Sequence, residues 1–266
     1  MTILRQFRSS RATLLALLFV AAAATSALVL TPVGRHASAA GARCGVPEEF
    51  TPLARPLPHL ARRLKEGGSL TIVALGSSST SGTGASTPAN SYPSRLAVAL
   101  AERFPELKIR VVNRGVAGEE APAMVARIER DVLPEKPDLV IWQLGTNSVL
   151  HDVDTAGSYN AVVRAGVLRM EAAGDDVMLM NLQYAPALLQ HGHLRDMLRI
   201  LDRIAYAEDV PLFPRFTIMR HWVEDGRMPL SAMVSPDRLH MTDMSYDCLA
   251  RELAAGIDVM YRGGRS

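Results

Sequence analysis

The sequence predicts a single three-layer α/β domain, in which a five-stranded parallel sheet lies between two layers of helices. Three observations predict it: five short apolar runs, segments of helical spacing between them, and no internal repeat or linker after the N-terminal segment. The composition agrees, because 48% hydrophobic and 21% charged residues in a chain of 266 are ordinary for a globular protein. It excludes a disordered or a collagen-like chain.

Five runs of apolar residues predict buried strands. These runs are residues 69–75, 108–112, 138–143, 176–181 and 210–213. The first is bounded by Gly68 and Gly76, which favour turns at both ends. Strands that are continuously apolar, rather than alternating, are typical of a parallel sheet covered on both faces.

Segments with helical spacing separate and follow these runs. They are residues 92–104, 121–133, 158–173, 194–208 and 243–261. In the first segment Leu96, Leu100 and Phe104 lie on one face. The second ends before Pro134, and Gly174 is the expected stop of the third. Helices that alternate with strands provide the crossovers that a parallel sheet needs.

The first 39 residues have the order of a secretory signal peptide. Three arginines lie within the first eleven residues, 19 uncharged residues from Ala12 to Leu30 follow, and Ala37-Ser38-Ala39 is a small-residue cleavage site. We expect cleavage after Ala39 and export to the periplasm or the cell exterior. An N-terminal membrane anchor is the alternative, because 19 helical residues span about 28 Å, which is enough to cross the core of a bilayer. The folded domain then covers residues 40–266, with an irregular lead-in to about residue 60.

The charge of the chain is concentrated in that N-terminal segment. The whole chain has a formal net charge of +2, but residues 1–39 hold four arginines and no acid, so the rest has 25 basic and 27 acidic side chains. A domain this close to neutral gives no electrostatic reason to expect a nucleic-acid partner. A membrane partner is expected only if the segment stays uncleaved, and the sequence does not determine the oligomeric state.

The chain has two cysteines, Cys44 and Cys248. In an oxidising compartment they can form one disulfide bond between the start of the domain and its last helix. The alternative is two buried or free thiols. No His or Cys stands at metal-ligand spacing beside either cysteine, so the sequence predicts no metal site there.

Small and polar residues gather in four segments, three of which directly follow strands. The segments are Gly76-Ser77-Ser78-Ser79-Thr80, Asn113-x-Gly115-x-x-Gly118, Gly145-x-Asn147 and Asp237-x-x-His240. Each alone has an ordinary explanation as a turn or a helix cap. Because the carboxyl ends of parallel strands meet at one edge of the sheet, we expect the segments to converge there.

In this order the four segments resemble the blocks of the SGNH hydrolases, also called the GDSL esterase/lipase superfamily. The resemblance extends from Leu70 to about His240 and implies a flavodoxin-like SGNH fold. It implies that Ser78 is the nucleophile, His240 the general base and Asp237 the residue that orients His240. The sequence departs from the family pattern at Ser77, where an Asp is usual, and at Ser148, where an acid usually follows the Asn.

The same resemblance implies an oxyanion hole made of the backbone N–H groups of Ser78 and Gly115 and the side-chain amide of Asn147. These residue types suit acyl transfer. A serine hydroxyl needs a base to accept its proton during attack, and imidazole, with an ordinary pKa of about 6.5, can do so at neutral pH. Fixed N–H donors stabilise the negative charge of the tetrahedral intermediate.

We therefore expect an exported serine esterase that hydrolyses acetyl or short acyl esters of a small-molecule, lipid or carbohydrate substrate. The expected chemistry uses no metal and no organic cofactor. Two alternatives stay open at the level of sequence. One is an O-acyltransferase that passes the acyl group to a saccharide through the same triad, and the other is a non-catalytic binding module on the SGNH fold.

Overall fold

A computed structural model of the chain describes residues 44–47, 55, 57–151 and 158–263. The expected export segment, residues 1–39, and most of the lead-in lie outside the described residues. The signal peptide, the anchor and the start of the domain at residue 40 therefore stay predictions. In the described part of the chain, no helix combines the length and apolar character needed to cross a membrane.

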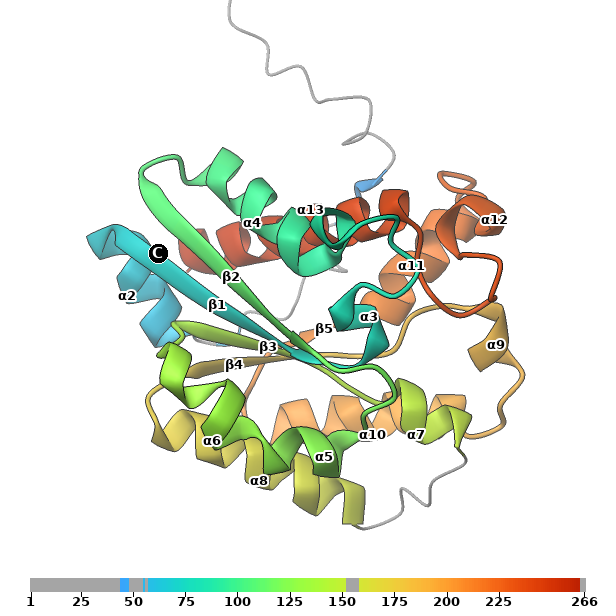
Figure 1. Cartoon of the computed structure of the whole chain (residues 1–266), viewed down its shortest axis with the longest axis horizontal. Helices are drawn as coiled ribbons and strands as arrows, with labels where there is room; N and C mark the ends of the chain where they lie inside the picture. Colours follow the sequence, from blue (N-terminus) through green and yellow to red (C-terminus); the bar gives the residue numbers. More distant parts are fainter. Residues whose placement is uncertain (1–43, 48–54, 56, 152–157, 264–266) are drawn as a thin grey trace, which may run out of the picture. The chain divides into compact units, whose positions relative to one another are not determined.

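The domain is built on one sheet of five parallel strands. In chain order these are β1 (Gly68–Gly76), β2 (Leu107–Gly115), β3 (Leu139–Gln143), β4 (Asp176–Met180) and β5 (Leu212–Phe213). They lie in the order β2-β1-β3-β4-β5, and all four pairings are parallel (Figure 1). This is the flavodoxin-like strand order, so the predicted five-stranded parallel sheet is confirmed.

Helices cover both faces of the sheet and form two hydrophobic cores (Figure 1). One face packs against α2 (Pro58–Glu66), α4 (Tyr92–Arg103), α11 (Arg215–Glu224) and α13 (Asp243–Gly263). The other packs against α5 (Ala121–Ala126), α6 (Ile128–Asp131), α8 (Ser158–Ala172) and α10 (Leu194–Ala207). In α10, for example, Met197, Leu201 and Ile204 recur at helical spacing and are buried. The predicted three-layer α/β/α arrangement is confirmed.

Several local features differ from the sequence prediction. The lead-in was expected to be irregular to about residue 60, but α2 already begins at Pro58, and proline is favoured in the first turn of a helix. The predicted helix 121–133 is interrupted at Arg127. Strand β2 is only partly buried, because it is an edge strand with a neighbour on one side.

Short helices and turns lie between the longer elements. They are α3 (Ser78–Ser81), the 3₁₀ turns η2 (Pro88–Asn90) and η3 (Leu133–Glu135), α7 (Thr146–Leu150), α9 (Pro186–Leu189) and α12 (Leu230–Met233). None of them was predicted, because one helical turn is too short to show a periodic pattern.

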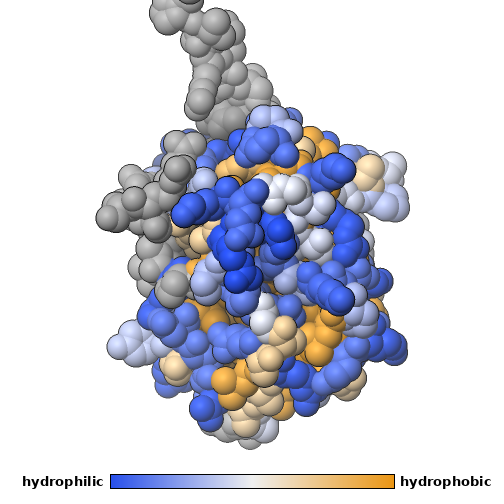
Figure 2. All heavy atoms as spheres, turned by 90° about the vertical axis from the view of Figure 1, so that its left-hand side faces the viewer, coloured by the Kyte–Doolittle hydropathy of each residue, from blue (hydrophilic) through white to orange (hydrophobic). Residues whose placement is uncertain are grey.

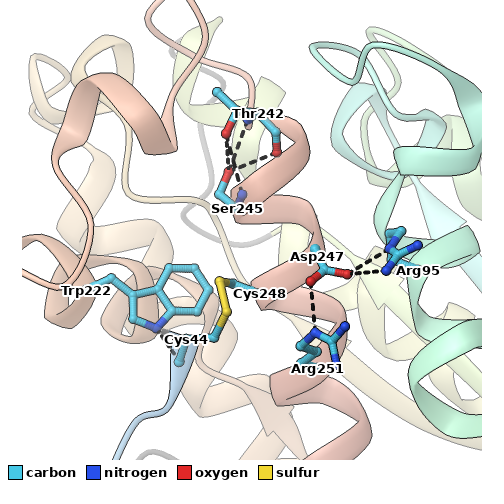
Figure 3. The surroundings of a disulfide bond; sticks show 8 residues. All are labelled: Cys44, Arg95, Trp222, Thr242, Ser245, Asp247, Cys248 and Arg251. Carbon is cyan, nitrogen blue, oxygen red and sulfur yellow. Dashed lines mark hydrogen bonds and ion pairs between the residues drawn. A yellow bond between two sulfur atoms is a disulfide. The ribbon is translucent and has the colours of Figure 1, made fainter. Parts of the chain in front are cut away.

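The start of the described chain is fastened to the last helix. Cys44 and Cys248 form a disulfide bond across a sequence separation of 204 residues (Figure 3). The indole N–H of Trp222 donates a hydrogen bond of 2.7 Å to the Cys44 carbonyl oxygen. The disulfide and this bond hold Cys44 against α11 and α13.

The two ends of the sheet differ in character. Figure 2 shows the face at which the strands begin, where hydrophilic side chains predominate and hydrophobic atoms appear in separate small groups. The four polar segments singled out in the sequence lie instead at the opposite end, where the strands finish and α3 and α7 start (Figure 1).

Candidate active site

The site lies where the strand order reverses. From β1 the chain crosses to β2 on one side, and from β3 it continues to β4 on the other, although β1 and β3 are neighbours in the sheet. In such sheets a crevice opens at the carboxyl ends of the two strands. The helices α3 and α7, which follow β1 and β3, therefore begin beside this crevice.

Ser78 is the first residue of α3. The preceding Ser77 is fully buried, and both its N–H and its hydroxyl donate hydrogen bonds of 3.0 Å to Gln143 Oε1. Gln143 is the last residue of β3, so the neighbouring strand fixes the turn that presents Ser78. The turn closes at Gly82, whose φ of 99° lies in the region that favours glycine.

The structure brings Ser78, His240 and Asp237 together. The Ser78 hydroxyl donates to His240 Nε2 over 2.8 Å, and His240 Nδ1 donates to Asp237 Oδ2 over 2.6 Å. A hydroxyl, an imidazole and a carboxylate in this order are the arrangement that activates a serine for nucleophilic attack. The first and last members lie 159 positions apart in the sequence, and only the fold joins them.

Asp237 is held by its own loop as well as by His240. Its Oδ1 accepts hydrogen bonds from the Ser235 hydroxyl at 2.6 Å and from the N–H groups of Leu239 and His240 at 2.9 Å. Burial by itself raises the pKa of Asp237. The hydrogen bonds from Ser235, Leu239 and His240 outweigh burial and hold the pKa of this carboxyl well below its ordinary value. Asp237 is therefore ionised at neutral pH.

The three expected oxyanion donors come from the end of β2 and from the segments that follow β1 and β3, and they differ in their present partners. Within the described part of the chain, the N–H of Ser78 has no acceptor. One N–H of the Asn147 amide donates to the Glu119 carbonyl oxygen over 2.7 Å, and an amide has a second N–H to offer.

The N–H of Gly115 is engaged in the structure, because it donates to Asn113 Oδ1 over 2.9 Å. It reaches a substrate oxyanion only if the Asn113 side chain turns or shares the proton. Glycine is nevertheless required at this position. A Cβ atom at Gly115 would lie 2.1 Å from the backbone nitrogen of Ser81, so β2 approaches α3 too closely for any side chain.

Sequence reasoning missed the buried polar residues that support the site. Gln183 lies just after β4, accepts from the Thr146 hydroxyl at 2.9 Å, and donates to the Leu239 carbonyl oxygen at 3.3 Å. It thereby links the start of α7 to the loop of His240. Gln143 and Gln183 share one sequence signal, a polar residue at the end of an apolar strand, but the signal does not indicate their partners.

Arg127 supports the other side of the site. Its guanidinium is buried, donates to the carbonyl oxygens of Gly76 and Arg114, and pairs with Glu119 at 2.7 Å. These contacts tie the ends of β1 and β2 to the residue whose carbonyl oxygen holds the Asn147 amide. In the part of the chain that the structure describes, no group of three or more His, Cys, Asp or Glu side chains is placed to hold a metal ion.

The sequence matches the Non-GDSL lipase-like family over residues 43–262, most of the chain. The chain belongs to this family. The segment of its expected nucleophile begins Gly76-Ser77-Ser78 and so lacks the Asp of a Gly-Asp-Ser-Leu motif. The family membership and the fold confirm the resemblance to the SGNH hydrolases, and the chain is an SGNH-type hydrolase by family.

Relatives of known activity are similar to parts of the chain. An acetylxylan esterase of Geobacillus stearothermophilus is 31% identical over 109 residues, which are 38% of this chain and about half (48%) of that protein. The crystal structure of Axe2, an acetylxylan esterase from the same organism, matches with a TM-score of 0.59 and 25% identity, covering 72% of this chain and 95% of that one.

A second structural neighbour is a two-domain esterase active on acetylated mannans. It matches with a TM-score of 0.66 and 24% identity, covering 80% of this chain and 56% of that one. At this identity the likeness concerns the fold. The present chain thus spans little more than half of that protein.

Proposed function

We propose that this protein is a serine esterase that hydrolyses acetyl or other short acyl esters. The observation that carries the proposal is the continuous chain of hydrogen bonds from the Ser78 hydroxyl through His240 to Asp237, at 2.8 and 2.6 Å. Family membership supports the same chemistry, because the relatives described above are esterases.

In this mechanism the Ser78 hydroxyl attacks the ester carbonyl while His240 Nε2 takes its proton. Asp237 fixes the proton of His240 on Nδ1 and stabilises the imidazolium that forms. The intermediate collapses as His240 returns the proton to the leaving alcohol, which leaves an acyl group on Ser78. A water molecule, deprotonated by His240, then attacks this acyl-enzyme, releases the acid and restores the Ser78 hydroxyl.

The N–H groups of Ser78 and Gly115 and the side-chain amide of Asn147 stabilise the negative charge of each tetrahedral intermediate by hydrogen bonds. The Ser78 N–H and the second Asn147 N–H can donate directly. The Gly115 N–H contributes once the Asn113 side chain releases or shares it. Donors fixed before the reaction stabilise this charge without reorganisation.

We propose a carbohydrate ester as the substrate and a location outside the cytoplasm. The named relatives act on acetylated xylan or mannan, which supports an acetylated carbohydrate. The signal-like N-terminal segment and the Cys44–Cys248 disulfide both favour an oxidising compartment, the periplasm or the exterior, with a membrane-anchored form as the alternative.

A fluorophosphonate probe tests the proposal directly, because it reacts only with an activated serine. We expect labelling at Ser78 and hydrolysis of 4-nitrophenyl acetate, with activity falling as the acyl chain lengthens. Ser78→Ala should abolish both labelling and hydrolysis while the protein stays folded. The matched control is Ser79→Ala, which removes a buried hydroxyl from the next position of α3 and should keep both.

Unchanged hydrolysis by Ser78→Ala would refute the assignment of the nucleophile. Absence of labelling in the wild-type protein would favour the alternative of a non-catalytic binding module on the same fold. Transfer of the acetyl group to an added saccharide, in place of release as acetate, would identify an acyltransferase.

A further inference from the structure

A hollow of about 510 Å³ borders the loop that carries Asp237 and His240. Its walls include Pro186, Leu230, Val234 and Pro236, and its lining contains one charged side chain, that of Arg238. A mostly apolar hollow with a single charged group is the usual composition of a site for a small molecule. None of the catalytic steps described above uses this hollow.

Arg238 is held in an unusual backbone conformation. Its φ of 65° lies in the left-handed region, which costs a residue with a Cβ atom about 1–2 kcal/mol. Two hydrogen bonds hold it there: its N–H donates to the Ser235 carbonyl oxygen at 2.9 Å, and its own carbonyl oxygen accepts from Ala187 at 3.0 Å. Glycine would fill this position without strain, so the arginine side chain is the feature that needs an explanation.

The side chain of Arg238 is exposed and, within the described ranges of the chain, makes no ion pair or hydrogen bond. The neighbouring Asp237 makes no ion pair with it, and its carboxylate bonds instead to Ser235, Leu239 and His240. The guanidinium is therefore available to a ligand in the hollow. Guanidinium groups bind carboxylates through two parallel N–H donors.

The chemistry of the triad decides which part of the substrate meets this hollow. His240 must hand its proton to the oxygen of the leaving alcohol, so the alcohol part of the ester lies on the His240 side of Ser78. Arg238 is two residues before His240, and Ser235, another lining residue, donates directly to Asp237. The hollow is lined by residues of the loop that carries His240, so the alcohol part is the part of the ester that we assign to it.

A second hollow of about 350 Å³ also borders this region and carries the opposite charge. It is lined by Gly84 and Asp243, and a Cβ atom at Gly84 would lie 2.9 Å from the Cβ of His240. The Asp243 carboxylate accepts bonds from Ser86 and Asn90, which hold its pKa below the ordinary value, so it is a fixed negative charge. An anionic alcohol part is repelled there and attracted to the hollow of Arg238.

We propose that the Arg238 hollow is a subsite for an alcohol part that carries a carboxylate, such as an acetylated acidic saccharide. The apolar walls pack against the C–H faces of the sugar, and Arg238 pairs with its carboxylate. A single guanidinium matches a single negative charge. This inference rests on the proposed esterase function and specifies its substrate class.

Two matched esters test the subsite: acetylated methyl glucuronoside and acetylated methyl glucoside, which differ only in the carboxylate. Acetate release gives kcat/KM for each. We expect the wild-type protein to prefer the acidic ester by about fivefold at low ionic strength, and the preference to shrink with added salt, because an exposed ion pair is screened. Arg238→Gln should bring the ratio of the two values to about one, and Arg238→Glu should bring it below one.

Two further variants keep the result interpretable. Arg203→Gln removes an exposed arginine from α10, away from the hollow, and should leave the ratio at its wild-type value. Arg238→Gly suits the backbone conformation, so it should lose the preference with no loss of thermal stability. If Arg238→Gln fails to fold, Arg238→Gly decides the question.

Equal kcat/KM values for the two esters in the wild-type protein would overturn the inference, as would a preference that survives in Arg238→Gln and Arg238→Gly. Either result leaves the proposed esterase intact, because the neutral ester is still hydrolysed and Ser78 still labelled. If neither ester is hydrolysed and Ser78 is not labelled, the proposed function itself fails, and the subsite falls with it.

Discussion

The two halves of the site are held in place in different ways. The segment around Ser78, the proposed nucleophile, is buried, with Ser77, Ser79 and Thr80 fully covered and Ser78 only 7% exposed. The loop of Asp237 and His240 is more open, since the side chain of Asp237 is 46% exposed and that of His240 is 13% exposed. A side chain of the neighbouring strand holds the first half, whereas the second half is held mainly by hydrogen bonds within its own loop, with support from Gln183.

This contrast follows from where the two segments lie in the chain. Ser78 lies just after β1, so Gln143 on the neighbouring strand β3 can hold its turn. His240 follows no strand, and its loop depends on the hydrogen bonds of Asp237, on Gln183, and on helix α13, which begins three residues later. The nucleophile should therefore withstand changes that displace the histidine.

Among variants that keep Ser78, the largest expected effect comes from Asp237→Asn, which alters the histidine half. The amide oxygen of Asn can accept the bonds from Ser235, Leu239 and His240, so the loop should stay folded. Its NH₂ group then donates to Nδ1 of His240, so the imidazole proton moves to Nε2. A protonated Nε2 cannot accept the proton of the Ser78 hydroxyl. We expect kcat to fall about 10⁴-fold with little change in melting temperature.

The control for this variant is Asp243→Asn, which removes a carboxylate near the same loop. The Asp243 carboxylate contacts Ser86 and Asn90 and not the histidine. It should cost far less activity. Equal losses in the two variants would mean that negative charge near the loop matters, and that the tautomer of His240 does not.

The next effect is that of Asn147→Ala, which removes one expected oxyanion donor. We expect kcat to fall about 10²–10³-fold while KM changes little, because the interaction strengthens only as the oxyanion forms. Asn160→Ala, an exposed position on α8, is the matched control. A change confined to KM would assign Asn147 to substrate binding.

Removal of the disulfide should affect stability more than chemistry. The double variant Cys44→Ala/Cys248→Ala loses a cross-link that closes a loop of about 200 residues, and we expect its unfolding free energy to fall by about 2–4 kcal/mol. Urea unfolding with and without reductant measures this, and reductant should have no effect on the double variant. If reductant does not weaken the wild-type protein, the bond contributes nothing to stability.

The smallest effect tests the nucleophile half itself. Gln143→Leu leaves the N–H and hydroxyl of Ser77 without their buried acceptor, which costs about 1–3 kcal/mol of stability. We expect a lower melting temperature and slower labelling of Ser78 by a fluorophosphonate. Gln190→Leu, at an exposed position, is the control for the change from Gln to Leu. Normal labelling in Gln143→Leu would show that the backbone of α3 holds Ser78 without this support.

The fold could be predicted well from the sequence, and the supports of the site could not. Apolar runs bounded by glycine located the strands, because a buried parallel strand needs contiguous apolar residues. The interruption at Arg127 escaped prediction, because the residues around it keep helical spacing. The interruption reflects tertiary contacts, because the buried Arg127 guanidinium donates hydrogen bonds to the carbonyl oxygens of Gly76 and Arg114.

The sequence by itself determined the order of the five strands and of the long helices between them, the position of Ser78, Asn147, Asp237 and His240 within it, and the type of chemistry that these residues suit. Each of these depends on spacing within a short stretch of chain, where covalent geometry restricts what neighbours can do.

Only the tertiary structure decided which groups meet. It set the approach of His240 to Ser78, the roles of Gln143 and Gln183, the engagement of the Gly115 N–H, and the hollow that leaves Arg238 without a partner among the described residues. These features join residues far apart in the sequence. Packing of the whole core selects such contacts, and no local pattern records them.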